Sequence, residues 1–398
     1  IMDQHCETPD MIQDACSTLL GIASDFSTHG LLVQKDFLPV LHKVMTKQNA
    51  CFQPLAKPYK LLVTLASNTA NRVTILDTGF LEPLRDVLEA HTDWIGVVRR
   101  VCQVVAKIAE SPQFKSHCDP QEMANVLQRV ILQRMSEPRV VNPACKALCN
   151  VALHMDDSDD TGTRELLGTL KEVLVRYVTQ RSLTVVACKA LANLTVKPKR
   201  SVAAFELCLL PVIHHCLDQD MVHPPLVKAI CDIASNLFAC GGGPAGSILP
   251  ILKRVLQQHS RYPPVVQASC HTLAVCITLH SHESPSHPPS SFLPDLGAAM
   301  QRHFAHPDVV AEGCWALATI ALQMTEDPVV CEGLTRDFLP LLLKVMNHHA
   351  SHATVLEEAC RALASIASQL PHQRALVCSL PTLKGVVSQY VAHAAVVT

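Results

Sequence analysis

The sequence Ala-Cys-Lys-Ala-Leu-Cys-Asn at residues 144–150 returns 43 residues later as Ala-Cys-Lys-Ala-Leu-Ala-Asn at residues 187–193. Related stretches recur along the whole chain. Aligning them gives one anchor position in each copy: Cys16, Tyr59, Cys102, Cys145, Cys188, Cys231, Cys270, Cys314 and Cys360. The first five spacings are 43 residues each, and the last three are 39, 44 and 46. A period of about 40–47 residues is typical of stacked helical repeats.

A second apolar position keeps a fixed distance from the anchor along the sequence. An apolar residue, usually leucine near a proline, precedes each anchor from Tyr59 to Cys360 by 18 residues. These leucine markers are Leu41, Leu84, Leu127, Leu170, Ile213, Leu252, Leu296 and Leu342. All variation in repeat length therefore falls between an anchor and the next leucine marker. This pattern predicts a rigid helix–turn–helix in each repeat, joined by a connection of variable length.

The spacing of apolar residues after each anchor predicts helices. Positions three, six and seven after the anchor are apolar or small in nearly every repeat, as at Leu148, Val151 and Ala152. These offsets form one stripe on an α-helix and cannot form one face of a strand. The sequence therefore predicts an all-α protein, a right-handed α-solenoid. We expect residues 1–398 to form a single array of about eight complete repeats, with partial repeats at both ends.

Composition excludes several classes of function. The chain has 33 Lys and Arg against 35 Asp and Glu, and 48% of its 398 residues are hydrophobic. This balance argues against disorder and against a general nucleic-acid partner. No apolar run reaches the roughly twenty residues that a membrane span needs. The 18 cysteines include no Cys-x-x-Cys pair, and no signal peptide is visible at the start, so we expect a cytoplasmic protein with reduced thiols. Access to the nucleus stays open.

The repeats resemble armadillo repeats. They share a second helix with a Leu-Pro-x-Leu pattern and a third helix close to Ala-Cys-x-Ala-Leu-x-Asn-Leu-Ala, which residues 315–321 match best. The resemblance covers essentially the whole chain. Because many repeats lack a clear first helix, a mixed armadillo/HEAT character stays open. The resemblance implies a concave groove, lined by the third helices, in which asparagine side chains hold the backbone of an extended peptide.

Positions one and five after each anchor supply the candidate peptide-binding residues. They share a helix face beside the buried stripe. The candidates are Lys146, Asn150, Lys189, Asn193, Asn236 and Trp315. Nuclear-import receptors of the armadillo family carry tryptophan where Lys146 and Lys189 stand, so an acidic peptide fits better here than a basic one. Alternatively, the lysines are ordinary solvated residues, the asparagines bond neighbouring carbonyls, and Trp315 packs. If the groove hypothesis holds, Asn150→Ala with Asn193→Ala weakens peptide binding without lowering the melting temperature.

Nothing in the sequence indicates catalysis, a cofactor or a small-molecule substrate. Nucleotide-binding glycine loops, the Gly-x-Ser-x-Gly elbow and the His-Glu-x-x-His motif are all absent. The anchor cysteines lie on the apolar stripe, where they act as small hydrophobic residues, and we expect no metal site. Several of the 21 histidines cluster, and we interpret them as solvated residues at helix C-termini. The clusters are His214 with His215, His280 with His282, His303 with His306, and His348, His349 and His352.

The sequence thus predicts a non-enzymatic protein–protein interaction scaffold that binds an extended acidic peptide. An alternative of a different class also stays open. The chain starts with Ile1, and both ends fall inside a repeat, so the array could be a regulatory or spacer segment of a larger protein. A kinase-like protein is one example, by analogy with armadillo-like tails on such proteins.

Overall fold

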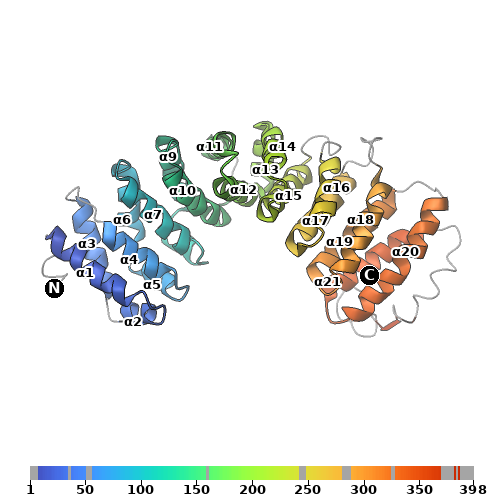
Figure 1. The fold of residues 1–398 in the computed structure, drawn as a ribbon, viewed down its shortest axis with the longest axis horizontal. Helices are drawn as coiled ribbons and strands as arrows, with labels where there is room; N and C mark the ends of the chain where they lie inside the picture. The colour runs from blue at the N-terminus through green and yellow to red at the C-terminus, as the bar shows by residue number, and fades with distance from the viewer. Residues whose placement is uncertain are drawn as a thin grey trace. The chain divides into compact units, whose positions relative to one another are not determined.

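The computed structural model describes residues 8–34, 37–50, 56–157, 161–241, 248–279, 288–323, 328–368, 381 and 384–385 (Figure 1). Over these residues the protein consists of helices and their connections, and no strand is present. The prediction of an all-α fold is confirmed. Many helices begin with proline, which fixes a helical backbone angle and lacks an N–H group that the first turn would leave unpaired.

Each anchor lies on the third helix of its repeat. Anchors from Cys16 to Cys314 are buried, and Cys360 is half-buried. The third helices are α1 (Pro9–Ile22), α4 (Ala56–Ala66), α7 (Ile95–Ile108), α10 (Pro138–Val151), α12 (Arg181–Thr195), α15 (Pro224–Ala239), α17 (Pro263–Leu279), α19 (Pro307–Gln323) and α21 (Ala353–Ser368). The predicted period therefore describes the core of the fold.

Each leucine marker lies on the second helix of its repeat, and all eight markers are buried. The second helices are α3 (Phe37–Ala50), α6 (Leu81–Ala90), α9 (Pro120–Gln133), α11 (Thr161–Tyr177), α14 (Leu209–Gln219), α16 (Leu249–Gln258), α18 (Leu293–Arg302) and α20 (Pro328–His348). The constant 18-residue separation keeps marker and anchor in register, because both side chains pack into the same core.

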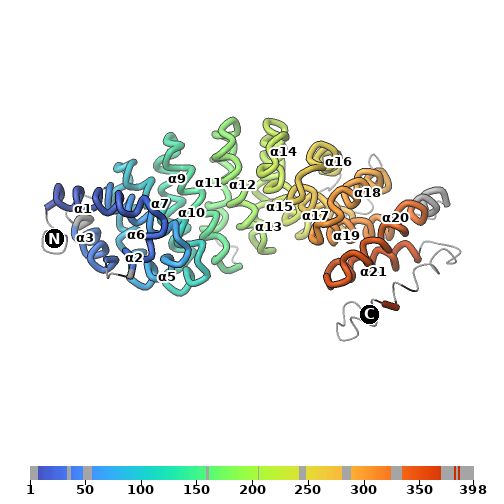
Figure 2. The backbone as a smooth tube through the Cα atoms, turned by 60° about the horizontal axis from the view of Figure 1, so that its bottom comes forward, coloured from blue at the N-terminus to red at the C-terminus, as the bar shows by residue number. Residues whose placement is uncertain are grey.

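The helices form two compact units, Ile1–Val212 and Ile213–Thr398, which we call unit 1 and unit 2. Within each unit, consecutive third helices pack against one another, for example α7 on α10 and α19 on α21 (Figures 1 and 2). The described part of the chain is thus an armadillo-like α-solenoid. The single array over residues 1–398 stays a prediction.

The two units differ in the first helix of the repeat. Unit 1 contains short first helices, namely α2 (Thr28–Gln34), α5 (Asn71–Asp77), α8 (Phe114–His117) and α13 (Pro198–Glu206), and a 3-10 turn, η1 (Ala152–His154). In the described residues of unit 2, a 3-10 turn η3 (Pro289–Phe292) precedes α18, and the other repeats have only two helices. Three helices are typical of armadillo repeats and two of HEAT repeats, so the mixed character that the sequence left open is present.

Histidines in unit 2 join consecutive repeats. His259, His303 and His349 each lie seven residues after a leucine marker and are buried. Their Nε2–H groups donate to carbonyls in the preceding repeat: to Met221 at 2.6 Å, to Ser260 at 2.8 Å and to Phe304 at 2.7 Å. In unit 1 the hydroxyl of Tyr177 occupies the same position and donates to the carbonyl of Met135.

This arrangement corrects the interpretation of the histidine clusters as solvated. It is wrong for His303 and His349, which are buried hydrogen-bond donors, whereas His306, His348 and His352 are exposed. His280 and His282 lie outside the described residues. A buried carbonyl needs a donor, and a helix end is where such carbonyls accumulate, which explains why a donor recurs at this position.

In the described part of the chain, no single helix is both long and apolar enough to cross a membrane. One pair of helices with a bend between them meets the criteria together, by length and composition alone: residues 198–204 with Leu209–Gln219.

Candidate functional site

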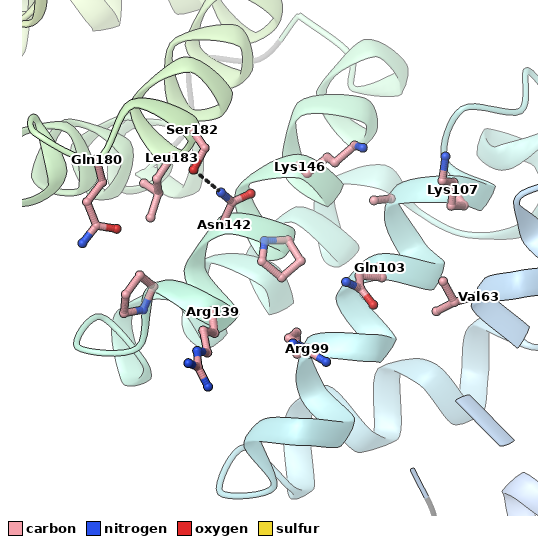
Figure 3. A pocket seen from close by; sticks show the side chains of 13 residues that line it. Val63, Arg99, Gln103, Lys107, Arg139, Asn142, Lys146, Gln180, Ser182 and Leu183 are labelled. Atoms are coloured by element: carbon pink, nitrogen blue, oxygen red, sulfur yellow. Dashed lines mark hydrogen bonds between the residues drawn. The ribbon is translucent and has the colours of Figure 1, made fainter. Parts of the chain in front are cut away.

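A groove of about 600 Å³ runs along the third helices of unit 1 (Figure 3). Side chains of α7, α10 and α12 form most of its lining. The polar lining residues are Arg99, Gln103, Lys107, Arg139, Asn142, Lys146, Gln180 and Ser182. Figure 3 shows these side chains on neighbouring helices, with Asn142 donating to the Ser182 hydroxyl at 3.3 Å. The groove spans successive repeats, as a site for an extended ligand would.

The helices around this groove carry only positive charge. Helices α4, α7, α10 and α12 contain no Asp or Glu. They contain nine Lys and Arg residues: Lys57, Lys60, Arg99, Arg100, Lys107, Arg139, Arg181, Lys146 and Lys189. Helix α1, the first third helix of unit 1, differs, since it carries Asp10 and Asp14. One-sided charge in a groove concentrates ligands of the opposite sign.

The groove cations lack carboxylate partners. In the described part of the chain, Arg99, Lys107, Arg139, Lys146 and Lys189 make no ion pair. Arginines on the second helices of the same unit are paired between repeats instead. They form the pairs Arg85–Glu122 at 3.0 Å, Arg129–Glu89 at 2.6 Å and, from α11 to α13, Arg164–Glu206 at 2.6 Å. In unit 1, these arginines of the second helices are thus paired with glutamates, whereas the cations on the groove side have no carboxylate partner within the described residues.

Like charges crowd together at the groove. Burial, and then the neighbouring charge of Arg99, lower the pKa of the Arg100 guanidinium below its ordinary value. The Nε of Arg99 is buried and has no hydrogen-bond partner among the described residues. Both observations describe cations that an anionic ligand would stabilise, since a nearby negative charge favours the charged form and supplies the missing acceptor.

Two of the sequence-predicted lysines lie on this face. Lys146 lines the groove, and both Lys146 and Lys189 are exposed. The half-buried thiol of Cys149 lies near both of them. Burial raises the pKa of this thiol, while the positive charges of Lys189 and Lys146 oppose the rise. The structure therefore brings the two lysines to one face of α10 and α12, as the repeat register predicts.

The predicted asparagines in unit 1 bond the preceding repeat. Asn150 Nδ2 donates to the carbonyl of Ala106 at 2.6 Å, and Asn193 Nδ2 donates to the carbonyl of Cys149 at 2.8 Å. Both side chains are half-buried. Their Oδ1 atoms accept no hydrogen bond within the described residues. The amide nitrogens thus hold the stack together, and the amide oxygens remain as acceptors for a peptide N–H.

The other two predicted residues belong to unit 2. Asn236 lies half-buried on α15. Trp315 lies half-buried on α19, with its ring centroid 5.0 Å from that of His271. Neither lines the groove of unit 1.

Sequence reasoning missed five polar groove residues that lie before their anchors: Arg99, Arg139, Asn142, Gln180 and Ser182. Arg99 and Asn142 stand three residues before their anchors, and Arg139 stands six residues before Cys145. On a helix these offsets share a face with the position one residue after the anchor. The signal that could have found them is the complete lack of Asp and Glu from four successive third helices.

The anchor cysteines have environments that suppress reactivity. Burial raises the pKa of Cys102, Cys231 and Cys270 to about 12. A thiol is a nucleophile and a metal ligand only as the thiolate, so these groups act as apolar core residues at neutral pH. In the described part of the chain, no group of three or more His, Cys, Asp or Glu residues could hold a metal ion.

A search of solved structures identifies the fold. The chain superposes with a TM-score of 0.69 on a structure described as showing a conserved phosphorylation switch that controls the interaction between cadherin and β-catenin. The match covers 97% of this chain and 83% of that chain, with 14% sequence identity. β-Catenin is an armadillo-repeat protein, and the predicted armadillo-like fold is confirmed. No family model matches the sequence. No curated protein matches it either.

Proposed function

We propose that the protein is a non-enzymatic interaction scaffold, and that the groove of unit 1 binds an extended acidic segment of a protein partner. The observation that supports this most is the charge of the third helices. Four of them in succession carry nine cations and no carboxylate, and four cations of the groove lining, Arg99, Lys107, Arg139 and Lys146, make no ion pair within the described residues. A solved structure that shares the fold carries a description that concerns the interaction between cadherin and β-catenin.

In this proposal the lysines and the asparagines have different roles. Lys146 and Lys189, with Arg99 and Arg139 beside them, attract the acidic side chains of the partner. The Oδ1 atoms of Asn150 and Asn193 accept N–H groups of the peptide main chain. Electrostatic attraction from exposed groups weakens as salt screens it, so binding should be tightest at low ionic strength.

The groove favours a peptide over single-stranded nucleic acid. No aromatic side chain lines it. Sites for single strands combine positive charge with aromatic rings on which the bases stack. A groove with positive charge and amide groups, but without rings, suits carboxylates on an extended backbone.

The test is binding of a labelled Gly/Ser peptide that carries several glutamates. Lys146→Glu with Lys189→Glu should weaken binding by about tenfold or more, because each reversal replaces attraction by repulsion. The matched control is Arg176→Glu on α11 with Lys199→Glu on α13, which makes the same charge change at exposed positions outside the groove. A single-stranded oligonucleotide serves as competitor.

Equal binding by the groove variant and the control variant would contradict the proposal, as would an oligonucleotide that displaces the peptide at equal concentration. Asn236 and the cytoplasmic location stay predictions that this experiment does not address. The alternative role, as a segment of a larger protein, also stays a prediction, and it is compatible with a functional groove.

A further inference from the structure

Trp315 stands in a different chemical setting from the lysines at its position in unit 1. Its ring lies beside His271 of α17, with 5.0 Å between centroids and 60° between the planes. The Nδ1 of His271 lies 3.1 Å from a carboxylate oxygen of Glu312, which precedes Trp315 on the same face of α19. An indole, an imidazole and a carboxylate therefore form one cluster on the third-helix face of unit 2.

The carboxylate of Glu358, in the next repeat, lies near that of Glu312. Glu358 of α21 stands two residues before its anchor, where Glu312 stands in α19, and the two helices pack together. Burial raises the pKa of Glu358, and the charges of Glu357 and Glu312 raise it further against the opposing effect of Arg361. Glu312 and Glu358 are therefore close enough to repel each other.

Charge around Trp315 is negative overall. Arg361 pairs with Glu357 at 3.1 Å and with Glu358 at 3.0 Å. One guanidinium is thus shared by two carboxylates, and Glu312 has His271 as its neighbour instead. Over the third helices of unit 2, the carboxylates are Asp232, Asp308, Glu312, Glu357 and Glu358, and the only cations are Lys228 and Arg361. An acidic segment would be repelled at this face, whereas a cation would be attracted.

We propose that this surface, which comprises His271, Glu312, Trp315, Glu357 and Glu358, binds an arginine side chain of a protein partner. The guanidinium plane stacks on the indole of Trp315, and the carboxylates of Glu312 and Glu358 act as counter-ions. Arginine fits because it combines a flat, weakly hydrated cation that stacks on aromatic rings with N–H groups that reach carboxylates. This site lies in unit 2 and selects the charge opposite to the one that the unit 1 groove attracts, so it does not rest on the proposed function.

The experiment uses the full chain with Trp94→Phe, which leaves Trp315 as the only tryptophan. The probe is a Gly/Ser peptide with several arginines, and its glutamine and glutamate counterparts are the reference peptides. The arginine peptide should change the emission of Trp315 and bind about fivefold or more tightly than the glutamine peptide. Glu312→Gln with Glu358→Gln should remove most of this preference.

The control is Glu165→Gln with Glu172→Gln, which removes two exposed carboxylates of α11 in unit 1 and should leave the preference unchanged. Trp315→Phe, read by anisotropy of a labelled peptide, should weaken binding, with helicity measured alongside to verify folding. Equal binding of the arginine and glutamine peptides would overturn the proposal, and so would full binding by the double glutamine variant. Titration of the glutamate peptide in the same series tests the unit 1 groove separately, so failure at one site is distinguishable from failure at the other.

Discussion

Units 1 and 2 are built on the same buried positions, and helices α7 and α21 carry opposite charge at the same half-buried positions. The residues three and two before the anchor are Arg99 and Arg100 in α7, and Glu357 and Glu358 in α21. The residue one after the anchor is Lys146 in α10 and Trp315 in α19. The repeat therefore fixes where these side chains lie, but leaves their chemistry free to vary.

Both units hold like charges close together, which costs stability. Charge repulsion contributes to the lowered pKa of Arg100 and to the raised pKa of Glu358. Scattered surface charges of mixed sign would avoid this cost, and the second helices of unit 1 have such an arrangement. Like charges also meet on the second helix α6, where burial and the charges of Glu82 and Glu89 raise the pKa of Asp86 against the opposing effect of Arg85. On the third-helix faces, such crowding fits surfaces that bind ligands of opposite sign.

One repeat bonds the next at two kinds of position. Buried histidines of unit 2, and Tyr177 of unit 1, donate to carbonyls just after second helices. Half-buried asparagines of unit 1, and Thr272 of unit 2, donate from third helix to third helix. Removing these donors should show which connection matters more to each stack.

The largest effect is expected from His303→Ala with His349→Ala. Each substitution leaves a partly buried carbonyl, of Ser260 or Phe304, without its donor, at a cost of about 1–3 kcal/mol. Amide hydrogen exchange should accelerate in α18 to α21, while helices of unit 1 keep their protection. His306→Ala with His348→Ala, at exposed neighbouring positions, is the control. Unchanged exchange in the buried-histidine variant would show that these hydrogen bonds do not hold unit 2 together.

A smaller effect is expected from Asn150→Ala with Asn193→Ala. Both amide nitrogens bond the preceding repeat, so we now expect the melting temperature to fall, in contrast to the expectation from sequence. Each lost hydrogen bond should cost about 0.5–1.5 kcal/mol, because these side chains are only half-buried. Calorimetry measures the change, and the glutamate peptide measures binding on the folded protein. A melting temperature equal to that of the parent protein would restore the original expectation.

The smallest effect is expected from Glu358→Gln. The folded state raises the pKa of this carboxyl, so between its ordinary and raised pKa the native state binds more protons than the unfolded state. Stability from this group therefore falls as the pH rises through that interval, and the penalty is complete at neutral pH. The substitution should stabilise unit 2 by less than about 1 kcal/mol at pH 7, and the gain should shrink in acid. Melting curves across pH test this, with Glu165→Gln as control; a gain that grows in acid would contradict it.

Much of the fold follows from the sequence because burial is periodic. The anchor and leucine positions mark two helices that pack into one core, and a one-dimensional pattern suffices to find them. The division into two units could not be predicted, since both use the same periodic signal. The sequence indicated that many repeats lack a clear first helix, but not which ones, because these helices are short and carry little pattern; in unit 2 this concerns the described residues alone.

The candidate site was only partly predictable. Lys146 and Lys189 follow from the register, because a helix face is fixed by offset from the anchor. The donors Asn150 and His303 do not reveal their roles in sequence, since a polar side chain at a helix edge can bond solvent, a ligand or the next repeat. Only the placement of Ala106 and Ser260 beside them decides between these roles.

The burial of most described cysteines favours one of them as an attachment point for a reporter group. Among the described cysteines, only Cys208 is exposed, with φ of 52° between α13 and α14. An alkylating dye at neutral pH should therefore react at Cys208 well before it reaches the anchors of the core. A fluorophore there would label unit 1 outside the core.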